Sequence, residues 1–395
     1  MQLITFCLIQ SSSAQYKDQL SPKVSIAINR NLETYFFAEK LAVEKMGGFV
    51  FDNKGEAYAH QPMVYFSSLQ FKKYQDTPAI LRIAVLLTLI RDKYQDNSKI
   101  LYHLINQKDF PEKGSLFSDI KSEPTDKESL QMQSVIAELT DSLRSFYVQA
   151  HVGTFFKDNA RYYTGALKEV EKDINVPAFS AMEKWFGRTF PAYQLYISPA
   201  MPITFGEDNY RGVGQQVLSA KGIVPGMIIS SSRMILMESG LLDYQKYGFD
   251  NPRVTEFLTK HEIGHSFVNP LLEKYAVQIK NDSSLFTPGL KKILAPHYIG
   301  DWYVCVIEHI VRMSEIRTAI SMGDFKEADR LRLLHIFGEK CVLIPLLEMK
   351  IASYEADRSH YPTFESYLPD LVTYLHSLTP EIINQQVVKY EHEGK

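Results

Sequence analysis

Residues 261–270 read His-Glu-Ile-Gly-His-Ser-Phe-Val-Asn-Pro and are the most informative stretch of the chain. On a helix, positions i and i+4 lie only about 40° apart, so His261 and His265 project from one face within reach of a single metal ion. Glu262 follows the first histidine, which places a carboxylate beside the ion as a general base for water. Zinc suits this set, because it binds imidazole and carboxylate ligands tetrahedrally and a catalytic site leaves one position open.

The residues around this motif have helical spacing. One apolar stripe contains Val254, Leu258, His261, His265, Val268 and Leu272. Both histidines are therefore predicted to face the interior, where a metal ion satisfies one ring nitrogen of each. The alternative interpretation is two core histidines with other partners beside an exposed Glu262. Asn269 and Pro270 are expected to break or kink the helix directly after the motif.

The third metal ligand is expected on a second helix. Residues 302–320 form a strongly apolar helical run that contains Glu308. An ionised carboxylate in such surroundings needs a counter-charge, which zinc would supply. The i,i+4 spacing equally permits a salt bridge from Glu308 to Arg312, and the two interpretations are compatible. The other candidates for the third ligand are His309, Glu315 and Asp301.

Periodicity predicts a few strands followed by many helices. The predicted strands are 23–29, Tyr193–Ile197 and Met227–Ser230. The predicted helices are one capped by Asn31, then 79–92, about 127–147, stretches near 155–187, and nearly everything from Pro252 onward. The polar stretch 108–127 is the best loop candidate. This order predicts an α+β fold, predominantly helical, with a small sheet before the helix that carries the motif.

The composition is that of a globular protein. The chain has 395 residues, of which 45% are hydrophobic and 23% charged, and its net charge of −3 gives no reason to expect nucleic acid as a partner. We expect a single domain over 15–395, with the metal-site region at about 190–375. Cys305 and Cys341 lie in apolar contexts, where buried free thiols are commoner than a disulfide.

The amino terminus indicates export. A short apolar run, Leu3–Ile9, precedes serines and Ala14, which is typical of the end of a secretory signal peptide. No Lys or Arg comes before the run, so we interpret residues 1–14 as a truncated signal peptide. No other apolar run approaches the length of a membrane span. The predicted location is therefore secreted or periplasmic.

The motif residues carry a family resemblance. HEIGHSFVNP, with the later Glu308-His309-x-x-Arg312, resembles a family of bacterial secreted proteins of unknown function that is regarded as zincin-like, over about Val24–Pro369. By motif alone the chain is also similar to gluzincin peptidases. The resemblance implies His261, His265 and Glu308 as zinc ligands and Glu262 as general base. The chain departs from some gluzincins in lacking an Asn-Glu-x-x-Ser-Asp signature around Glu308 and in the long gap before it.

Together these observations predict a zinc-dependent metallopeptidase that hydrolyses peptide bonds of a peptide or protein substrate. The side chains suited to stabilise an oxyanion are Tyr303, His309, Arg312, Tyr354 and Arg358, and spacing does not choose among them. By analogy with zincins, Tyr193–Ile197 is expected to be an edge strand that pairs with substrate. The alternative function is a non-catalytic secreted binding or scaffold protein with a structural or degenerate zinc site.

Overall fold

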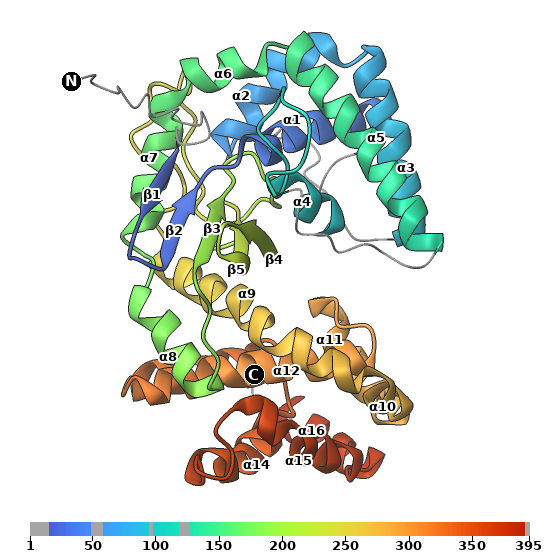
Figure 1. Cartoon of the computed structure of the whole chain (residues 1–395), viewed down its shortest axis with the longest axis vertical. Coiled ribbons are helices and arrows are strands. Elements are labelled where there is room, and N and C mark those ends of the chain that lie inside the picture. Colours follow the sequence, from blue (N-terminus) through green and yellow to red (C-terminus); the bar gives the residue numbers. More distant parts are fainter. Residues whose placement is uncertain (1–15, 49–57, 95–97, 118–126, 392–395) are drawn as a thin grey trace, which may run out of the picture. The chain divides into compact units, whose positions relative to one another are not determined.

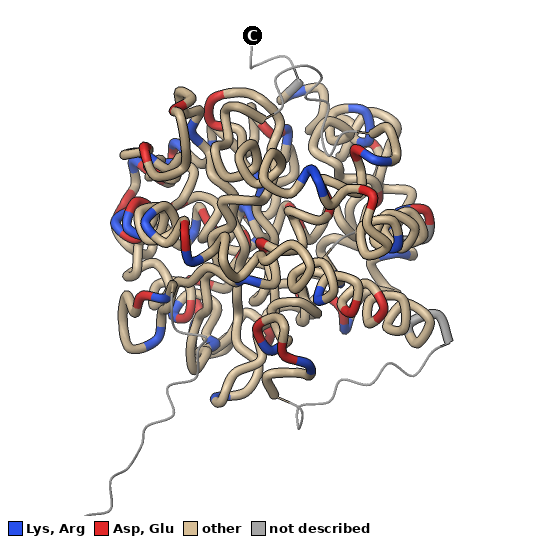
Figure 2. The backbone as a smooth tube through the Cα atoms, turned by 90° about the horizontal axis from the view of Figure 1, so that it is seen from above, with Lys and Arg blue, Asp and Glu red and all other residues tan. Residues whose placement is uncertain are grey.

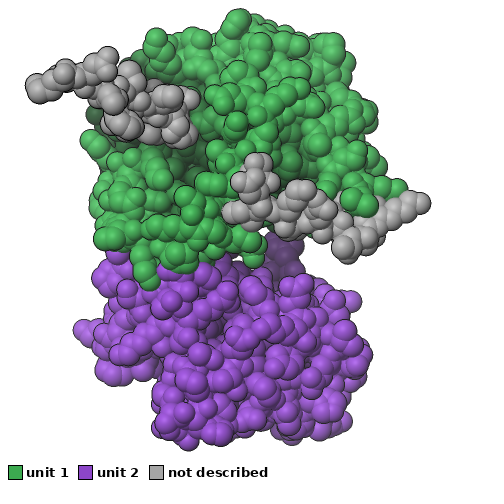
Figure 3. Space-filling model, viewed as in Figure 1, with its two compact units in different colours: residues 1–174, 191–258 green, residues 175–190, 259–395 purple. Residues whose placement is uncertain are grey.

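The computed structural model describes residues 16–48, 58–94, 98–117 and 127–391 (Figure 1). Most of these residues are helical, and the strands form one mixed five-stranded sheet, which confirms the α+β class. The chain divides into two compact units: unit 1 comprises 1–174 and 191–258, and unit 2 comprises 175–190 and 259–395 (Figure 3). The single domain expected over 15–395 stays a prediction, and the predicted signal peptide, 1–14, lies outside the described residues.

The sheet belongs to unit 1. Its strands are β1 (Lys17–Gln19), β2 (Val24–Ala27), β3 (Tyr193–Ile197), β4 (Gly212–Ser219) and β5 (Gly222–Ile229), in the order β1-β2-β3-β5-β4. β3 pairs in parallel with both β2 and β5, while the outer pairs are antiparallel. The prediction of an edge strand at Tyr193–Ile197 is therefore wrong: β3 is central, and both of its sides are occupied by backbone hydrogen bonds.

Helices accompany the sheet in unit 1. They are α1 (Arg30–Lys45), α2 (Pro62–Phe71), α3 (Pro78–Tyr94), α4 (Ser98–Ile105), α5 (Lys127–Gln149), α6 (Val152–Asp158) and α7 (Ala160–Glu171). The predicted helices at 79–92 and 127–147 are confirmed. The predicted cap is not: Asn29 caps α1 through its side chain, whereas Asn31 is buried inside the helix and bonds to the 104–110 segment.

In the described part of unit 2 all secondary-structure elements are helices, joined by loops. Its helices are α8 (Val176–Phe186), most of α9 (Pro252–Leu272), α10 (Ala276–Asn281), α11 (Pro288–Leu294), α12 (Trp302–Ser321), α13 (Phe325–Arg332), a π-helix (Leu333–Gly338), α14 (Ile344–Ala356), α15 (Phe364–His376) and α16 (Pro380–Glu391). Short 3-10 turns occur in unit 2 at Glu273–Tyr275, Ser283–Leu285 and Ala295–His297, and in unit 1 at Lys72–Tyr74. α12 is central to this unit, since α8, α10, α13 and α14 all pack against it.

Two further predictions can be compared with unit 2. α9 continues through Pro270 to Leu272, so the predicted break directly after the motif is wrong, while the predicted kink stays a prediction. Within the described residues, Cys305 and Cys341 are buried free thiols, as predicted. Acidic and basic residues are interspersed along the chain (Figure 2). Within the described residues, no helix combines the length and apolar character that a membrane crossing requires.

Candidate metal centre

The candidate site lies where α9 packs against α12. Gly264 makes this close approach possible, because a Cβ added there would stand 3.1 Å from Cγ1 of Val311. α12 is preceded by its N-cap residue Asp301, whose side chain accepts a hydrogen bond from the backbone N–H of Val304 at 2.9 Å. Asp301 is thus a helix cap, and the structure does not place it among the metal ligands. Glu308 follows two turns later on the face that meets α9.

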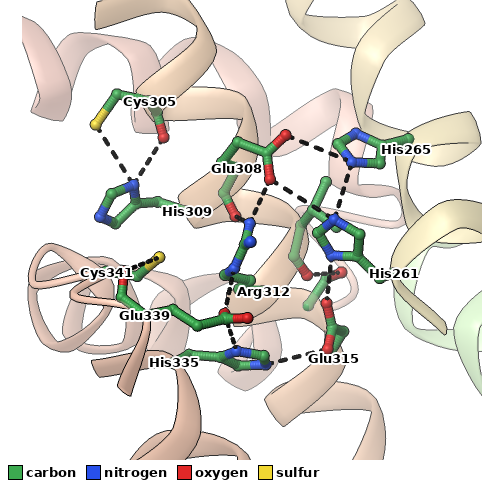
Figure 4. Close-up of polar contacts among 12 residues, drawn as sticks. His261, His265, Cys305, Glu308, His309, Arg312, Glu315, His335, Glu339 and Cys341 are labelled. Carbon is green, nitrogen blue, oxygen red and sulfur yellow. Dashed lines mark hydrogen bonds and ion pairs between the residues drawn. The ribbon is translucent and has the colours of Figure 1, made fainter. Parts of the chain in front are cut away.

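The predicted ligands come together (Figure 4). Nε2 of His261 and Nε2 of His265 are 3.3 Å apart, and Glu308 oxygens lie 3.7 and 3.6 Å from them respectively. Among the described residues, these three form the group that could hold a metal ion. Two ligand atoms at about 2.0–2.1 Å from a tetrahedral zinc ion are separated by about 3.3–3.4 Å. The three side chains therefore fit zinc with small adjustments.

The opposite ring nitrogens fix the tautomers of both histidines. Nδ1 of His261 donates to Oε1 of Glu315 at 2.9 Å, and Nδ1 of His265 donates to Oδ1 of Asn269 at 3.1 Å. Each Nε2 is consequently left with a lone pair, directed toward the other histidine and toward Glu308. Two lone pairs and a carboxylate that converge at these distances require a cation or a proton between them.

The pKa values of the metal-free site follow from this crowding. Burial and the charge of Arg312 lower the pKa of His261, but the bond to Glu315 and nearby carboxylates outweigh them and raise it. Burial and the charge of His261 lower the pKa of His265. Burial raises the pKa of Glu308, yet the charges of His265, His261 and Arg312 bring it down to about 2. Glu308 is therefore an ionised carboxylate that lies against the two histidines.

Glu308 also has the predicted salt bridge. Arg312, one turn further along α12 and 7% exposed, donates to Oε2 of Glu308. Its Nε donates to Oε2 of Glu339 at 2.6 Å, so one guanidinium joins two carboxylates. Both interpretations of the Glu308 sequence context are thus compatible with the geometry: a potential metal ligand that is oriented by an arginine.

Glu262, the predicted general base, is buried next to the ligands on α9. It is 8% exposed, and its charge raises the pKa of both His261 and His265. The charged groups around the site are Glu262, Glu308, Glu315, Glu339, Arg312 and His335. With His335 as an imidazolium, four carboxylates oppose two cations, and a divalent ion would balance the difference of two charges.

Several other predicted candidates have structural partners instead. Nδ1 of His309 donates to the Cys305 carbonyl at 2.7 Å, on a different face of α12 from Glu308 (Figure 4), and burial lowers its pKa to about 4. Tyr354 and Arg358 both donate to the carbonyl of Trp185. In His309 the Nδ1 atom is therefore occupied, while its buried Nε2 has no hydrogen-bond partner among the described residues; the structure does not place it in the group with His261, His265 and Glu308. Glu315, another candidate ligand, instead holds Nδ1 of His261.

Two site residues were not predicted from the sequence: His335 and Glu339. His335 is fully buried in the π-helix Leu333–Gly338, and its two ring nitrogens contact Oε2 of Glu339 at 2.8 Å and Oε2 of Glu315 at 3.1 Å. π-helical turns occur often at functional sites. The available signal was weak: a histidine and a glutamate at i,i+4 in an apolar stretch, 20 or more positions after the α12 residues they serve.

Comparison with known proteins places the chain by family. The profile of one family, described as a domain of unknown function (DUF4932), matches residues 58–374, which is most of the chain. No curated protein and no solved structure matches it. The expected membership of a family of unknown function is confirmed; the matched range ends near the predicted Pro369 but begins at residue 58 rather than at Val24. The chain belongs to the DUF4932 family.

Proposed function

We propose that this protein is a zinc-dependent metallopeptidase. The observation that carries the proposal is the convergence of the two Nε2 atoms, 3.3 Å apart, on the carboxylate of Glu308, with Glu262 buried in the same helix. A structural zinc site needs a fourth protein ligand, whereas the group found among the described residues offers three. Three ligands leave one position for water or substrate, as catalytic zinc sites do.

Each residue of the site has a distinct role in the proposed reaction. His261, His265 and Glu308 would hold the zinc, which when bound supplies a Lewis acid that polarises a scissile carbonyl and makes water more acidic. Glu262 would take the proton from the attacking water and return it to the leaving amine. Glu315 and Asn269 hold the two imidazoles in the tautomer that keeps Nε2 available. The proposed substrates are peptides or proteins.

The location remains a proposal from the sequence. The apolar run at Leu3–Ile9 with its following small residues supports a secreted or periplasmic protein. Extracellular zinc peptidases act on peptides outside the cell, which agrees with the proposed chemistry but does not name a substrate.

Glu262→Gln tests the catalytic part of the proposal. Glutamine keeps the size and leaves His261, His265 and Glu308 in place, so zinc content should stay at the parent level. Hydrolysis of an unstructured protein such as casein should fall by about 100-fold or more, because general-base catalysis typically contributes about 10²–10⁴-fold. Parent and variant are compared for zinc content and for casein cleavage in the same preparation.

The alternative function is a binding or scaffold protein with a structural or degenerate zinc site. In that case the parent binds zinc and cleaves neither casein nor a mixed peptide library, and Glu262→Gln changes nothing. Parental activity in the Glu262→Gln variant would refute the assigned role of Glu262. These outcomes are separable because zinc content and hydrolysis are measured independently.

A further inference from the structure

The contacts behind His261 continue well beyond its first partner. Glu315, 1% exposed, accepts from His261 through Oε1 at 2.9 Å and faces Nε2 of His335 through Oε2 at 3.1 Å. His335 then reaches Oε2 of Glu339 with Nδ1 at 2.8 Å. An imidazole that lies between two carboxylates can donate a hydrogen bond to each of them when both of its ring nitrogens are protonated.

The same chain of contacts returns to the other ligand helix. Oε2 of Glu339 accepts from Nε of Arg312 at 2.6 Å, and Arg312 donates through Nη1 to Oε2 of Glu308. Glu308 and Arg312 stand at i and i+4 of α12, and Glu315 at i+7, so one face of this helix supplies three members. The remaining two, His335 and Glu339, come from the π-helix and the residue after it.

We propose that Glu315, His335, Glu339 and Arg312 form one positioning device, here named the buried ring, which orients His261 from one end and Glu308 from the other. The ring closes because His261 and Glu308 converge on the same point, 3.7 Å apart (Figure 4). This inference rests on the proposed metal site, but it does not depend on hydrolysis.

The closed arrangement has a physical consequence. Glu315 contacts one partner through each of its two oxygens, and Oε2 of Glu339 alone contacts both Arg312 and His335. Glu315, His335 and Arg312 are buried, so bulk water is poorly placed to replace a lost partner. A break at one link therefore loosens the groups at both ends. Partners that orient metal ligands typically contribute about 10- to 100-fold to metal affinity. We expect the four residues of the buried ring to contribute to zinc affinity together, so that breaking a second link causes little further loss.

The test is a double-mutant cycle on zinc affinity, measured by competition with a chromophoric chelator on the full chain. Glu315→Gln and Glu339→Gln should each weaken zinc binding by about 10- to 100-fold. The zinc affinity of the double variant should be close to that of whichever single variant binds zinc more weakly. If the two residues acted independently, the two fold-losses of affinity would multiply. The nitrogen chemical shifts of His261 in the zinc-loaded variants should show a loss of the Nε2-bound tautomer, which loosened packing alone would not produce.

The matched control is Glu348→Gln. Glu348 lies on α14, is 15% exposed in its side chain against 12% for Glu339, and pairs with Arg317 of α12 and with Arg332, away from the ligands. This variant should lower thermal stability and leave zinc affinity within about twofold of the parent. Arg312→Lys is a second probe of the ring: it keeps the charge but loses the planar fork that joins two carboxylates.

The outcomes separate the two proposals. Parental zinc affinity in Glu315→Gln, Glu339→Gln and Arg312→Lys would overturn the ring, as would losses that multiply in the double variant. If the single ring variants do not fold, Arg312→Lys with parental affinity still overturns it. A parent that binds no zinc refutes the metal site itself. A parent that binds zinc without hydrolysing peptides refutes the peptidase and leaves the ring testable.

Discussion

The close contact of α9 with α12 at Gly264 predicts how strongly a Gly264→Ala substitution should disturb the metal site. In Gly264→Ala, the added Cβ would lie 3.1 Å from Cγ1 of Val311, whereas ordinary carbon contacts are about 3.5–4.0 Å. Val311, or the helix that carries it, must therefore move away by at least about 0.4 Å to reach an ordinary contact. Metal–ligand distances tolerate only about 0.2 Å. We expect a strain of about 1–3 kcal/mol, partly offset by the helix propensity of alanine, about 1 kcal/mol better than glycine.

Zinc binding is the more sensitive readout of this change. The metal-free variant can relieve strain by opening the α9–α12 contact, and the zinc-bound form cannot. If zinc binding forces the two helices of Gly264→Ala back into contact at a cost of about 1–2 kcal/mol, the zinc affinity of the variant falls roughly 5- to 30-fold. Gly289→Ala on α11 is the matched control, because the nearest atoms to its new Cβ lie at 3.6 Å. Chelator competition and chemical denaturation are measured on both variants. Parental zinc affinity in Gly264→Ala, with stabilisation equal to that of Gly289→Ala, would refute the reasoning.

Two further predictions concern pH and metal removal. In unit 1, burial raises the pKa of Glu33 from 4.5 to about 8, although Ser198 and the Ala200 N–H donate to it. Because the pKa is higher in the folded state, the stabilisation is complete below about pH 4.5 and is lost as the pH rises to about 8, a decline of roughly 3–5 kcal/mol in the free energy of unfolding. Glu33→Gln should flatten this decline in chemical denaturation measured across the pH range. An unchanged pH profile in the variant would contradict the prediction. Zinc at 100 times its Kd should stabilise the folded state by about 2.7 kcal/mol, so a chelator should lower the melting temperature and added zinc should restore it. A melting temperature that does not respond to zinc would contradict zinc binding to the folded state.

The sequence predicted local structure well where a pattern is complete within one segment. The long amphipathic runs that became α3, α5 and α12 were assigned correctly, and the predicted bounds of β3 are those observed. β1 and β4 were not predicted, because β1 is three polar residues and β4 contains two glycines and adjacent glutamines. The position of β3 in the middle of the sheet depends on pairing between distant segments, which no local pattern records.

The candidate site shows the same division. His261 and His265 follow from i,i+4 spacing, and Glu308 from the cost of burying a carboxylate in an apolar helix. The partners His335 and Glu339 were missed, since they reach Glu315 and Arg312 only through packing of the 333–339 segment against α12.

The most direct test of the central claim is the zinc content of the purified full chain and of its Glu308→Ala variant, by elemental analysis after dialysis against trace zinc. The three converging ligand atoms predict close to one zinc per chain in the parent and a clear loss in the variant. Zinc retained by Glu308→Ala would contradict the assignment of the third ligand. A parent that holds no zinc, even after metal is added, would contradict the metal centre and the function proposed from it.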